Sequence, residues 1–328
     1  MKKHAMNKVL AKLGAAAMLA MVSMQPVVVV AQTPETVHLI HGQGTGGTTD
    51  ALARMLGNEW GKRLNKNVVV ESRPGAATSL AASLVHKAAP DGKTLLFTAS
   101  GFTANPFLLK ELPYDSEKDF VGVGLVAATP YVLVVTPNLP VSTAQELVEY
   151  LKKHPEQSTV AVTSIGSAQH ISAALFRKMS GVDMVFVPYK GSAGQIADVA
   201  TGRVPVAFDN VVAIASQIKA GTVKPIAVTT RERSEMFPDI PTLHESGYPD
   251  FNIVGWFGAL APSGVPASVV ETYGNSVKQI KEDPEFGERV RALGATVIPG
   301  GHAEAHAFIQ EDLKKTGELI RDLNISLE

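Results

Sequence analysis

Short apolar runs alternate with amphipathic stretches along most of the chain from Val37 onward. Runs rich in β-branched residues predict strands, and apolar residues spaced three or four apart predict helices. In the first part of the chain, strands are predicted at 37–40, 67–71 and 94–98, and helices at 50–64 and 79–88. This alternation is typical of βαβ units, so it predicts an α/β fold with parallel strands.

The same alternation returns in the middle of the chain. Strands are predicted there at 159–164, 184–189, 204–209 and 224–230, and helices at 171–179 and 193–201. Two separate groups of βαβ units favour two α/β lobes over one long sheet. The length of 328 residues also fits two domains.

The residues between the two groups are rich in β-formers. Residues 121–135 are predicted to form two strands that meet at Thr129–Pro130 and carry the chain into the second lobe. A return to the first lobe is expected around 252–266. The tail is predicted to add helices at 268–282, 284–293 and 303–323 and a strand at 296–299, packed on the first lobe.

The first thirty residues differ from the rest of the chain. They begin with lysines and no acidic residue, continue with an apolar stretch at 13–24, and end in small residues before Gln32. This order is typical of a secretory signal peptide, and Pro26 interrupts the apolar run before it is long enough to span a membrane. We therefore expect export, and we divide the chain into a signal peptide (1–31), lobe 1 (32–130 plus 251–328) and lobe 2 (131–250).

The composition and residue spacing exclude several kinds of functional site. The chain has no cysteine, which excludes disulfides, thiolate metal sites and a cysteine nucleophile. A formal net charge of −1 gives no electrostatic footprint for nucleic acid. His302 and His306 lie four residues apart but lack the zinc-protease order, and no carboxylate pair suggests acid–base catalysis. We expect no cofactor, no metal and no catalytic residue.

A glycine-rich loop lies between the first predicted strand and the helix that follows. Residues 42–47 read Gly-Gln-Gly-Thr-Gly-Gly, a G-x-G-x-x-G pattern. Glycines let backbone amides face outward, and a helix N-terminus adds a partial positive charge, so this loop suits a small anion. Two alternatives stay open. One is the dinucleotide site of an NAD(P)-dependent oxidoreductase, with Glu71 as the ribose-binding acid, and the other is a purely structural turn.

A second loop of the same kind occurs in the middle of the chain. Residues 163–170 follow a predicted strand and precede a predicted helix. Taken alone, this loop is better explained as an ordinary helix cap. Two such loops, one in each lobe, suggest a grip on two sides of one ligand. Asp209, at the end of a predicted strand, faces the cleft or caps the next helix.

Several short motifs occur in a fixed order from about Val37 to the C-terminus. They include GGTTD (46–50), ESRPGA (71–76), PDGKTLL (90–96), GSAQH (166–170), VPYKG (187–191) and FPDIPTLHESGYP (237–249). In this order they resemble the solute-binding proteins of the tripartite tricarboxylate transporter family, the Bug type. The resemblance implies a type II periplasmic binding protein, or Venus flytrap. Each of its two lobes would be a mixed sheet flanked by helices, and it would have no catalytic activity.

The resemblance also implies a ligand and a partner. A periplasmic protein of this family closes on a small carboxylate and presents it to membrane permease subunits. Its two loops hold the carboxylate through backbone amides and ordered waters, and Asp209 lies near the ligand end that differs among substrates. The predicted ligand-binding residues are Gln43, Gly44, Thr45, Gly46, Gly47, Thr48, Asp50, Ser100, Thr103, Ser164, Gly166, Ser167, His170 and Asp209. We expect a monomer; an exported sensor for a membrane kinase is the alternative to transport.

Three departures from the family pattern leave the ligand open. Gln43 and Thr45 stand where many members have a Pro-aromatic-rich stretch. Ser164 replaces a common glycine, and Ala77–Thr78 replace a glycine pair. The first departure predicts a smaller and more polar wall beside the ligand.

Overall fold

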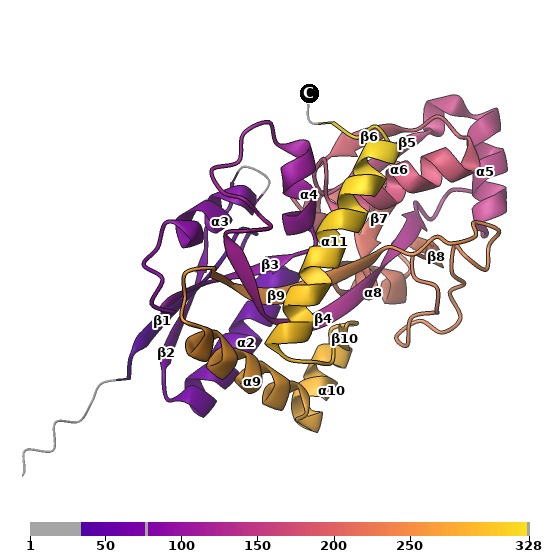
Figure 1. The fold of residues 1–328 in the computed structure, drawn as a ribbon. Coiled ribbons are helices and arrows are strands. Elements are labelled where there is room, and N and C mark those ends of the chain that lie inside the picture. The colour runs from indigo at the N-terminus through magenta and orange to yellow at the C-terminus, as the bar shows by residue number, and fades with distance from the viewer. Residues whose placement is uncertain (1–33, 76–77, 327–328) are drawn as a thin grey trace, which may run out of the picture. The chain divides into compact units, whose positions relative to one another are not determined.

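Two sheets share one long strand in the computed structural model, which describes residues 34–75 and 78–326 (Figure 1). The predicted signal peptide at 1–31 lies outside these residues. Within the described ranges, no helix combines the length and the apolar character needed to cross a membrane.

The first sheet contains strands from both ends of the described chain. Its order is β2–β1–β3–β9–β4, and β10 also pairs with β4. β1, β2 and β3 run parallel, and β9 lies antiparallel between β3 and β4. Its strands are β1 (Thr36–His41), β2 (Asn67–Ser72), β3 (Thr94–Ala99), β4 (Phe120–Val135), β9 (Val254–Pro262) and β10 (Thr296–Val297).

The second sheet uses strands that follow one another in the sequence. Its order is β4–β7–β5–β6, and β8 also pairs with β4. β5 runs parallel to β6 and β7, whereas β4 is antiparallel to β7 and β8. The additional strands are β5 (Thr159–Val162), β6 (Val185–Pro188), β7 (Val206–Asn210) and β8 (Lys224–Val228).

Strand β4 passes without a break from one sheet to the other. It pairs with β9 as far as Pro130 and with β7 from Tyr131 onward. The prediction of two separate strands meeting at Thr129–Pro130 was therefore wrong. Proline fixes φ at a value compatible with an extended strand, and its missing amide is tolerated here because β4 changes partners at this point.

The helices flank both sheets. Those of the first sheet are α2 (Thr48–Leu64), α3 (Ser79–His86), α4 (Gly101–Leu108), α9 (Ala267–Lys281), α10 (Pro284–Ala292) and α11 (His302–Asp322). Those of the second sheet are α5 (Ala144–Lys153), α6 (Ala168–Ser180), α7 (Ser192–Ala200) and α8 (Val211–Ala220), with a short 3₁₀ helix at Pro155–Gln157. The predicted helices agree with these within a few residues. No helix range was predicted for α4, α5 or α8.

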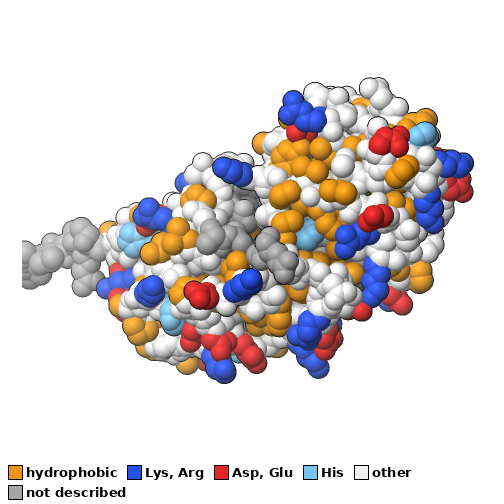
Figure 2. Space-filling model, turned by 90° about the horizontal axis from the view of Figure 1, so that it is seen from above, with side chains coloured by type: hydrophobic (Ala, Val, Ile, Leu, Met, Phe, Trp, Pro, Cys, Tyr) orange, Lys and Arg blue, Asp and Glu red, His pale blue; other side chains and the backbone are white. Residues whose placement is uncertain are grey.

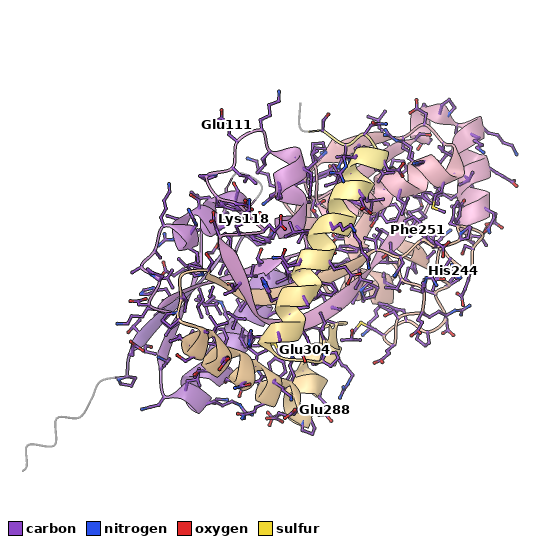
Figure 3. All side chains as sticks on the ribbon, in the orientation of Figure 1. Glu111, Lys118, His244, Phe251, Glu288 and Glu304 are labelled. Atoms are coloured by element: carbon purple, nitrogen blue, oxygen red, sulfur yellow. The ribbon has the colours of Figure 1, made fainter. Side chains whose placement is uncertain are left out.

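Each sheet packs its helices over apolar clusters of its own. In the first core, the buried rings of Trp60 and Tyr273 lie 4.9 Å apart between α2 and α9. In the second core, the ring centroids of Phe176 and Tyr248 lie 5.1 Å apart. Phe251, which is labelled in Figure 3, is fully buried there. Burial of each such side chain contributes roughly 1.5–3 kcal/mol to the free energy of folding. A further cluster joins α4 to α6 and the end of α11.

Candidate functional site

The two loops predicted to bind an anion follow the carboxyl ends of parallel strands. The first loop, 42–47, connects β1 to α2, and the second loop, 163–167, connects β5 to α6. Ligands of α/β proteins commonly bind outside the carboxyl ends of the strands. Each loop leads directly into a helix N-terminus, where backbone amides lack partners within the helix.

A buried carboxylate holds the first loop. Asp50 Oδ2 accepts the amide of Gly46 over 3.0 Å and the Nε–H of Arg54 over 3.1 Å. His41 Nε2 lies 3.1 Å from the other carboxylate oxygen. Burial alone would raise the pKa of Asp50, but the hydrogen bonds from Arg54, Gly46 and His41 lower it overall. Asp50 is therefore an ionised side chain that is already bonded within the protein.

The tip of the first loop is open to solvent. Residues 43–47 are exposed, and Gly47 precedes α2 without a side-chain cap. In the part of the chain that the structure describes, no hydrogen bond engages the amides of Gly44, Thr45 and Gly47. Exposed amides next to a helix N-terminus are suited to an anion.

A buried histidine holds the second loop. His170 Nδ1 accepts the amide of Gly166 over 3.0 Å. Ser167 caps α6 because its Oγ accepts the amide of His170, and it donates to Ser164 O over 2.7 Å. Burial lowers the pKa of His170 to about 4, so the ring is neutral and Nδ1 is free to accept.

Asp209 is fully buried at the end of β7. Its carboxylate accepts hydrogen bonds from Ser192 Oγ (2.9 Å), Gln169 Nε2 (3.2 Å) and Gln195 Nε2 (3.2 Å). Among the described residues, its hydrogen-bond donors are all neutral. Burial therefore raises the pKa of Asp209 to about 6, although the hydrogen bonds oppose this.

Asn210, and not Asp209, caps helix α8. Asn210 Oδ1 accepts the amide of Ala213 over 3.0 Å, whereas Asp209 accepts the amide of Asn210 over 2.8 Å. The alternative in which Asp209 caps this helix is therefore wrong. The cap lies one residue later because the strand still includes Asp209 and Asn210.

The first turns of α2 and α6 both form hydrogen bonds with the end of β7. Thr48 Oγ1, at the start of α2, donates to Asn210 Oδ1 over 3.3 Å. Gln169, in the first turn of α6, donates to Asp209. Hydrogen bonds thus connect α2, β7 and α6, and residues far apart in the sequence meet at one place.

Ser100 and Thr103 lie at the start of α4. Ser100 Oγ is 3.5 Å from the hydroxyl of Tyr131 on the shared strand β4. Thr103 is fully buried, and its hydroxyl donates to Asp312 Oδ2 of α11 over 2.7 Å. The same oxygen accepts from Trp256 Nε1 over 2.8 Å. The Thr103 hydroxyl therefore fastens α4 to α11.

Sequence reasoning missed several residues near these loops. Ser192 and Gln195, which donate hydrogen bonds to Asp209, were not among the predicted ligand-binding residues. Thr78 has φ +72°, a left-handed conformation that is strained for a β-branched residue. A Cβ atom at Gly42 would lie 2.7 Å from Thr78 Cβ, so the residues before α3 contact the first loop.

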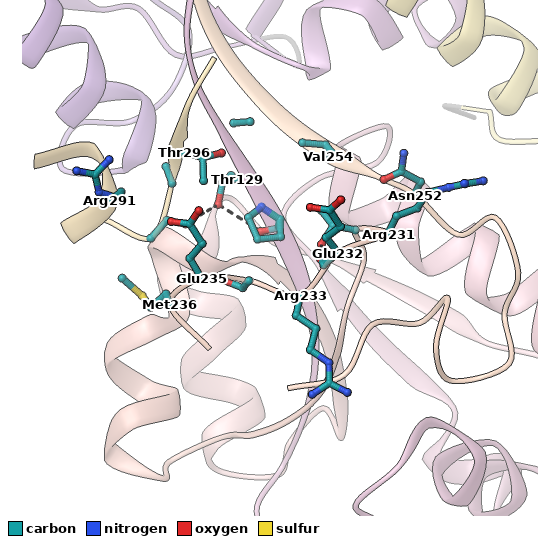
Figure 4. Close-up of a pocket in the computed structure, with 16 residues that line it drawn as sticks. Thr129, Arg231, Glu232, Arg233, Glu235, Met236, Asn252, Val254, Arg291 and Thr296 are labelled. Carbon is teal, nitrogen blue, oxygen red and sulfur yellow. Dashed lines mark hydrogen bonds between the residues drawn. The ribbon is translucent and has the colours of Figure 1, made fainter. Parts of the chain in front are cut away.

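A separate hollow lies beside the shared strand β4 (Figure 4). Its volume is about 500 Å³, and its walls include Thr129, Pro130, Arg291 and residues 230–236. None of the predicted ligand-binding residues lines this hollow. Arg231 and Arg233 in its wall are ion-paired with Asp250 and Glu245. We therefore do not assign it to the candidate site.

Two further observations limit the chemistry. Positive and negative side chains are interspersed on the face shown in Figure 2, without a large patch of one sign. Within 34–75 and 78–326, no group of three or more His, Asp or Glu side chains is arranged to hold a metal ion. The candidate site thus offers backbone amides, hydroxyls and side-chain amides, together with the carboxyl groups of Asp50 and Asp209.

Known proteins share both the sequence and this architecture. The family model described as "Tripartite tricarboxylate transporter family receptor" matches residues 52–325. The structure of R. palustris Rpa4515 with adipate has a TM-score of 0.85 and 31% identity, covering 89% of this chain and 99% of that one. The periplasmic binding protein BugD gives a TM-score of 0.82 with 31% identity and the same coverage. MatC from Rhodopseudomonas palustris with bound malate gives 0.80 with 29% identity, covering 87% and 99%.

These similarities settle the fold class and one of the alternatives left open by the sequence. The related proteins have a two-lobed α/β fold, so the predicted fold class is confirmed. They are solute-binding receptors and not enzymes, so the oxidoreductase alternative for residues 42–47 is wrong. The chain belongs to the tripartite tricarboxylate transporter receptor family and is a solute-binding receptor of the Bug type.

Proposed function

We propose that this protein captures a small carboxylate between its two lobes and delivers it to the permease subunits of a tripartite transporter. The observation that carries this proposal is the hydrogen-bonded connection from Thr48 through Asn210 and Asp209 to Gln169. It brings two helix N-termini, and the loops that precede them, to one place. Adipate and malate in the related structures support a carboxylate as the ligand class.

The proposed lobes are residues 32–130 plus 251–328 and residues 131–250. The change of partners along β4 supports this division, because pairing with β9 ends at Pro130 and pairing with β7 begins at Tyr131. We propose that the mature protein works in the periplasm after removal of residues 1–31. The basic and then apolar order of that segment and the periplasmic relative BugD support export.

Neutral donors would hold the ligand in this proposal. Each hydrogen bond from an amide to a carboxylate contributes about 1.5–3 kcal/mol, because one partner is charged. The exposed amides of Gly44, Thr45 and Gly47 would hold one carboxylate, and Ser164 in the second loop would face the other side of the ligand. Closure of the lobes would then shift the population toward the form that a permease recognises.

Thermal unfolding of the chain from Gln32 tests the ligand class. The panel contains adipate, malate, citrate, glutamate and benzoate, with NADP as a decoy. A ligand at about 100 times its dissociation constant adds about 2.7 kcal/mol, which raises the midpoint by several degrees. A shift with one or more carboxylates is the expected result. No shift with any carboxylate, after unfolding and refolding to remove a co-purified ligand, overturns carboxylate binding.

Delivery needs a separate experiment. Membrane vesicles that contain the permease subunits should take up the identified carboxylate only when the loaded protein is added. Binding without uptake, together with a response of a membrane kinase, would favour the sensor alternative. A variant that does not bind the ligand is the matched control in both assays.

A further inference from the structure

The two loops contain the same local construction. Gly46 and Gly166 both adopt left-handed conformations, with φ values of +81° and +78°. Each donates its amide over 3.0 Å to a side chain four residues later, Asp50 in the first loop and His170 in the second. We call these the two glycine–acceptor pairs.

Each acceptor side chain is also held in place by contacts with residues outside its loop. In the first pair, Asp50 is 5% exposed and is bonded to His41 and Arg54. In the second pair, His170 is 4% exposed, and its ring packs edge-on against Phe186 at 4.6 Å. The acceptors are thus rigid parts of α2 and α6 that face back toward the loops preceding them.

The pairs also determine which amides remain for a ligand. The amides of Gly46 and Gly166 are used within the protein, although both glycines were predicted to bind the ligand. In the first loop, the neighbouring amides of Gly44, Thr45 and Gly47 have no partner among the described residues. At a glycine with a positive φ, the backbone amide points in the opposite sense to the amides of its neighbours. The hydrogen bond of this one amide therefore fixes the orientation of the other amides in the loop.

We infer that Asp50 and His170 are positioning residues, which act by holding the amides of Gly46 and Gly166 and thereby orient the other loop amides toward the ligand. The part of this inference that concerns a ligand rests on the proposed function. The part that concerns loop geometry does not depend on it. The two acceptors differ in charge, since Asp50 is anionic and His170 is neutral.

The glycine–acceptor pair of Gly166 and His170 can be tested with a matched set of variants. Asn carries an oxygen at the same distance along the side chain as His Nδ1, so His170→Asn keeps an acceptor for Gly166. His170→Leu has a similar size and no acceptor. In the wild type, ¹⁵N NMR of the imidazole should show a neutral ring with its proton on Nε2. The Gly166 amide should be protected from hydrogen exchange in the wild type and in His170→Asn, but not in His170→Leu.

Adipate is the probe for the consequence at the site. We expect His170→Leu to bind adipate about tenfold more weakly than the wild type, and His170→Asn to recover most of that loss, because an unsatisfied buried amide is costly. A proton on Nδ1, or an equally protected Gly166 amide in His170→Leu, overturns the inference. If His170→Leu does not fold, the wild-type imidazole spectrum decides.

Failure of the proposed function gives a different pattern. In that case the wild type binds neither adipate nor the other carboxylates, while the imidazole proton and the Gly166 amide still behave as expected. Equal adipate affinity in all three proteins, with loss of Gly166 protection in His170→Leu, would show that the pair orders the loop without serving the ligand, and it would overturn the positioning role.

Discussion

The hydroxyl of Thr48 donates to the side-chain oxygen of Asn210, 162 residues further along the chain, over 3.3 Å. Thr48 is the first residue of α2, and Asn210 is the last residue of β7 and the cap of α8. One hydrogen bond therefore joins the proposed lobe 1 to the proposed lobe 2 beside the exposed loop. Its loss should affect the closed form more than either lobe alone.

Replacement of Thr48 tests this link. Thr48→Val keeps the size of the side chain and removes the hydroxyl, and a hydrogen bond of this kind contributes roughly 1 kcal/mol. We expect adipate affinity, measured by calorimetry, to fall about fivefold. Thr48→Ser retains the donor and is the control. Equal affinities in Thr48→Val and the wild type would contradict a role of this bond in closure.

The buried carboxyl of Asp209 should make stability depend on pH. Burial raises its pKa in the folded state to about 6, above the ordinary value of 3.8. Between about pH 4 and pH 6 the folded state thus binds more protons than the unfolded state, so the contribution of Asp209 to stability falls as the pH rises. Asp209→Asn should remove this contribution, which lowers the free energy of unfolding by on the order of 2 kcal/mol between about pH 4 and pH 6.

Urea unfolding at pH 4.5 and pH 7 measures that difference. The comparison of slopes matters more than absolute stability, because asparagine also changes the hydrogen bonds to Gln195 and Ser192. Asp239→Asn, at an exposed position, is the matched control and should leave the slope of the wild type. An unchanged slope in Asp209→Asn would show that Asp209 stays ionised in the fold.

A side chain at Gly166 should disrupt the contact between α4 and the second loop. An added Cβ would lie 2.0 Å from Leu108 Cδ1, and φ at this position is +78°. We expect Gly166→Ala to lower the free energy of unfolding by about 2–4 kcal/mol, from the left-handed conformation and the overlap together. Gly44→Ala, which meets no described atom within 4 Å, should change it little.

A second variant separates the two causes at Gly166. In a Leu108→Ala background the overlap disappears but the backbone conformation does not change. The additional loss caused by Gly166→Ala should then shrink to about 1–2 kcal/mol. Chemical denaturation of the wild type, the two single variants and the double variant gives the coupling free energy between the two substitutions. Strict additivity would mean that Leu108 moves aside at no cost.

Thr78 is expected to cost the protein stability. Its φ of +72° is unfavourable for a β-branched side chain, and its hydroxyl does not cap α3. Thr78→Gly should raise the free energy of unfolding by about 1 kcal/mol, whereas Thr78→Ala keeps a Cβ atom and should raise it less. A lower stability in Thr78→Gly than in Thr78→Ala, measured by denaturation, would contradict strain at this residue.

Periodicity was sufficient for most elements of the fold. The apolar spacing in Leu52, Leu56 and Trp60 predicted α2, and all three side chains are buried. Helix α4 was missed because Gly101, Asn105 and Pro106 are poor helix formers, and its position depends on tertiary contacts such as that from Thr103 to Asp312. Helix α5 carried a readable signal, the capping box of Thr143 and Glu146, that was overlooked.

The candidate site was only partly accessible from the sequence. The loops were identified from glycines after strands, a local signal. The partners of Asp209 come from α6 and α7 and meet it only through the fold. The spacing from Gly46 to Asp50 and from Gly166 to His170 is visible in the sequence, but its meaning depends on the sign of φ at each glycine.

The central position of β9 in the first sheet has a consequence for folding. β9 lies between β3 and β4, yet it comes after all strands of the second sheet in the chain. The second sheet is built from neighbouring segments, whereas the first sheet stays open between β3 and β4 until residues 254–262 arrive. Contacts between such distant segments form slowly. A chain that ends before Val254 should therefore expose two unpaired strand edges and aggregate, even though its second sheet is complete.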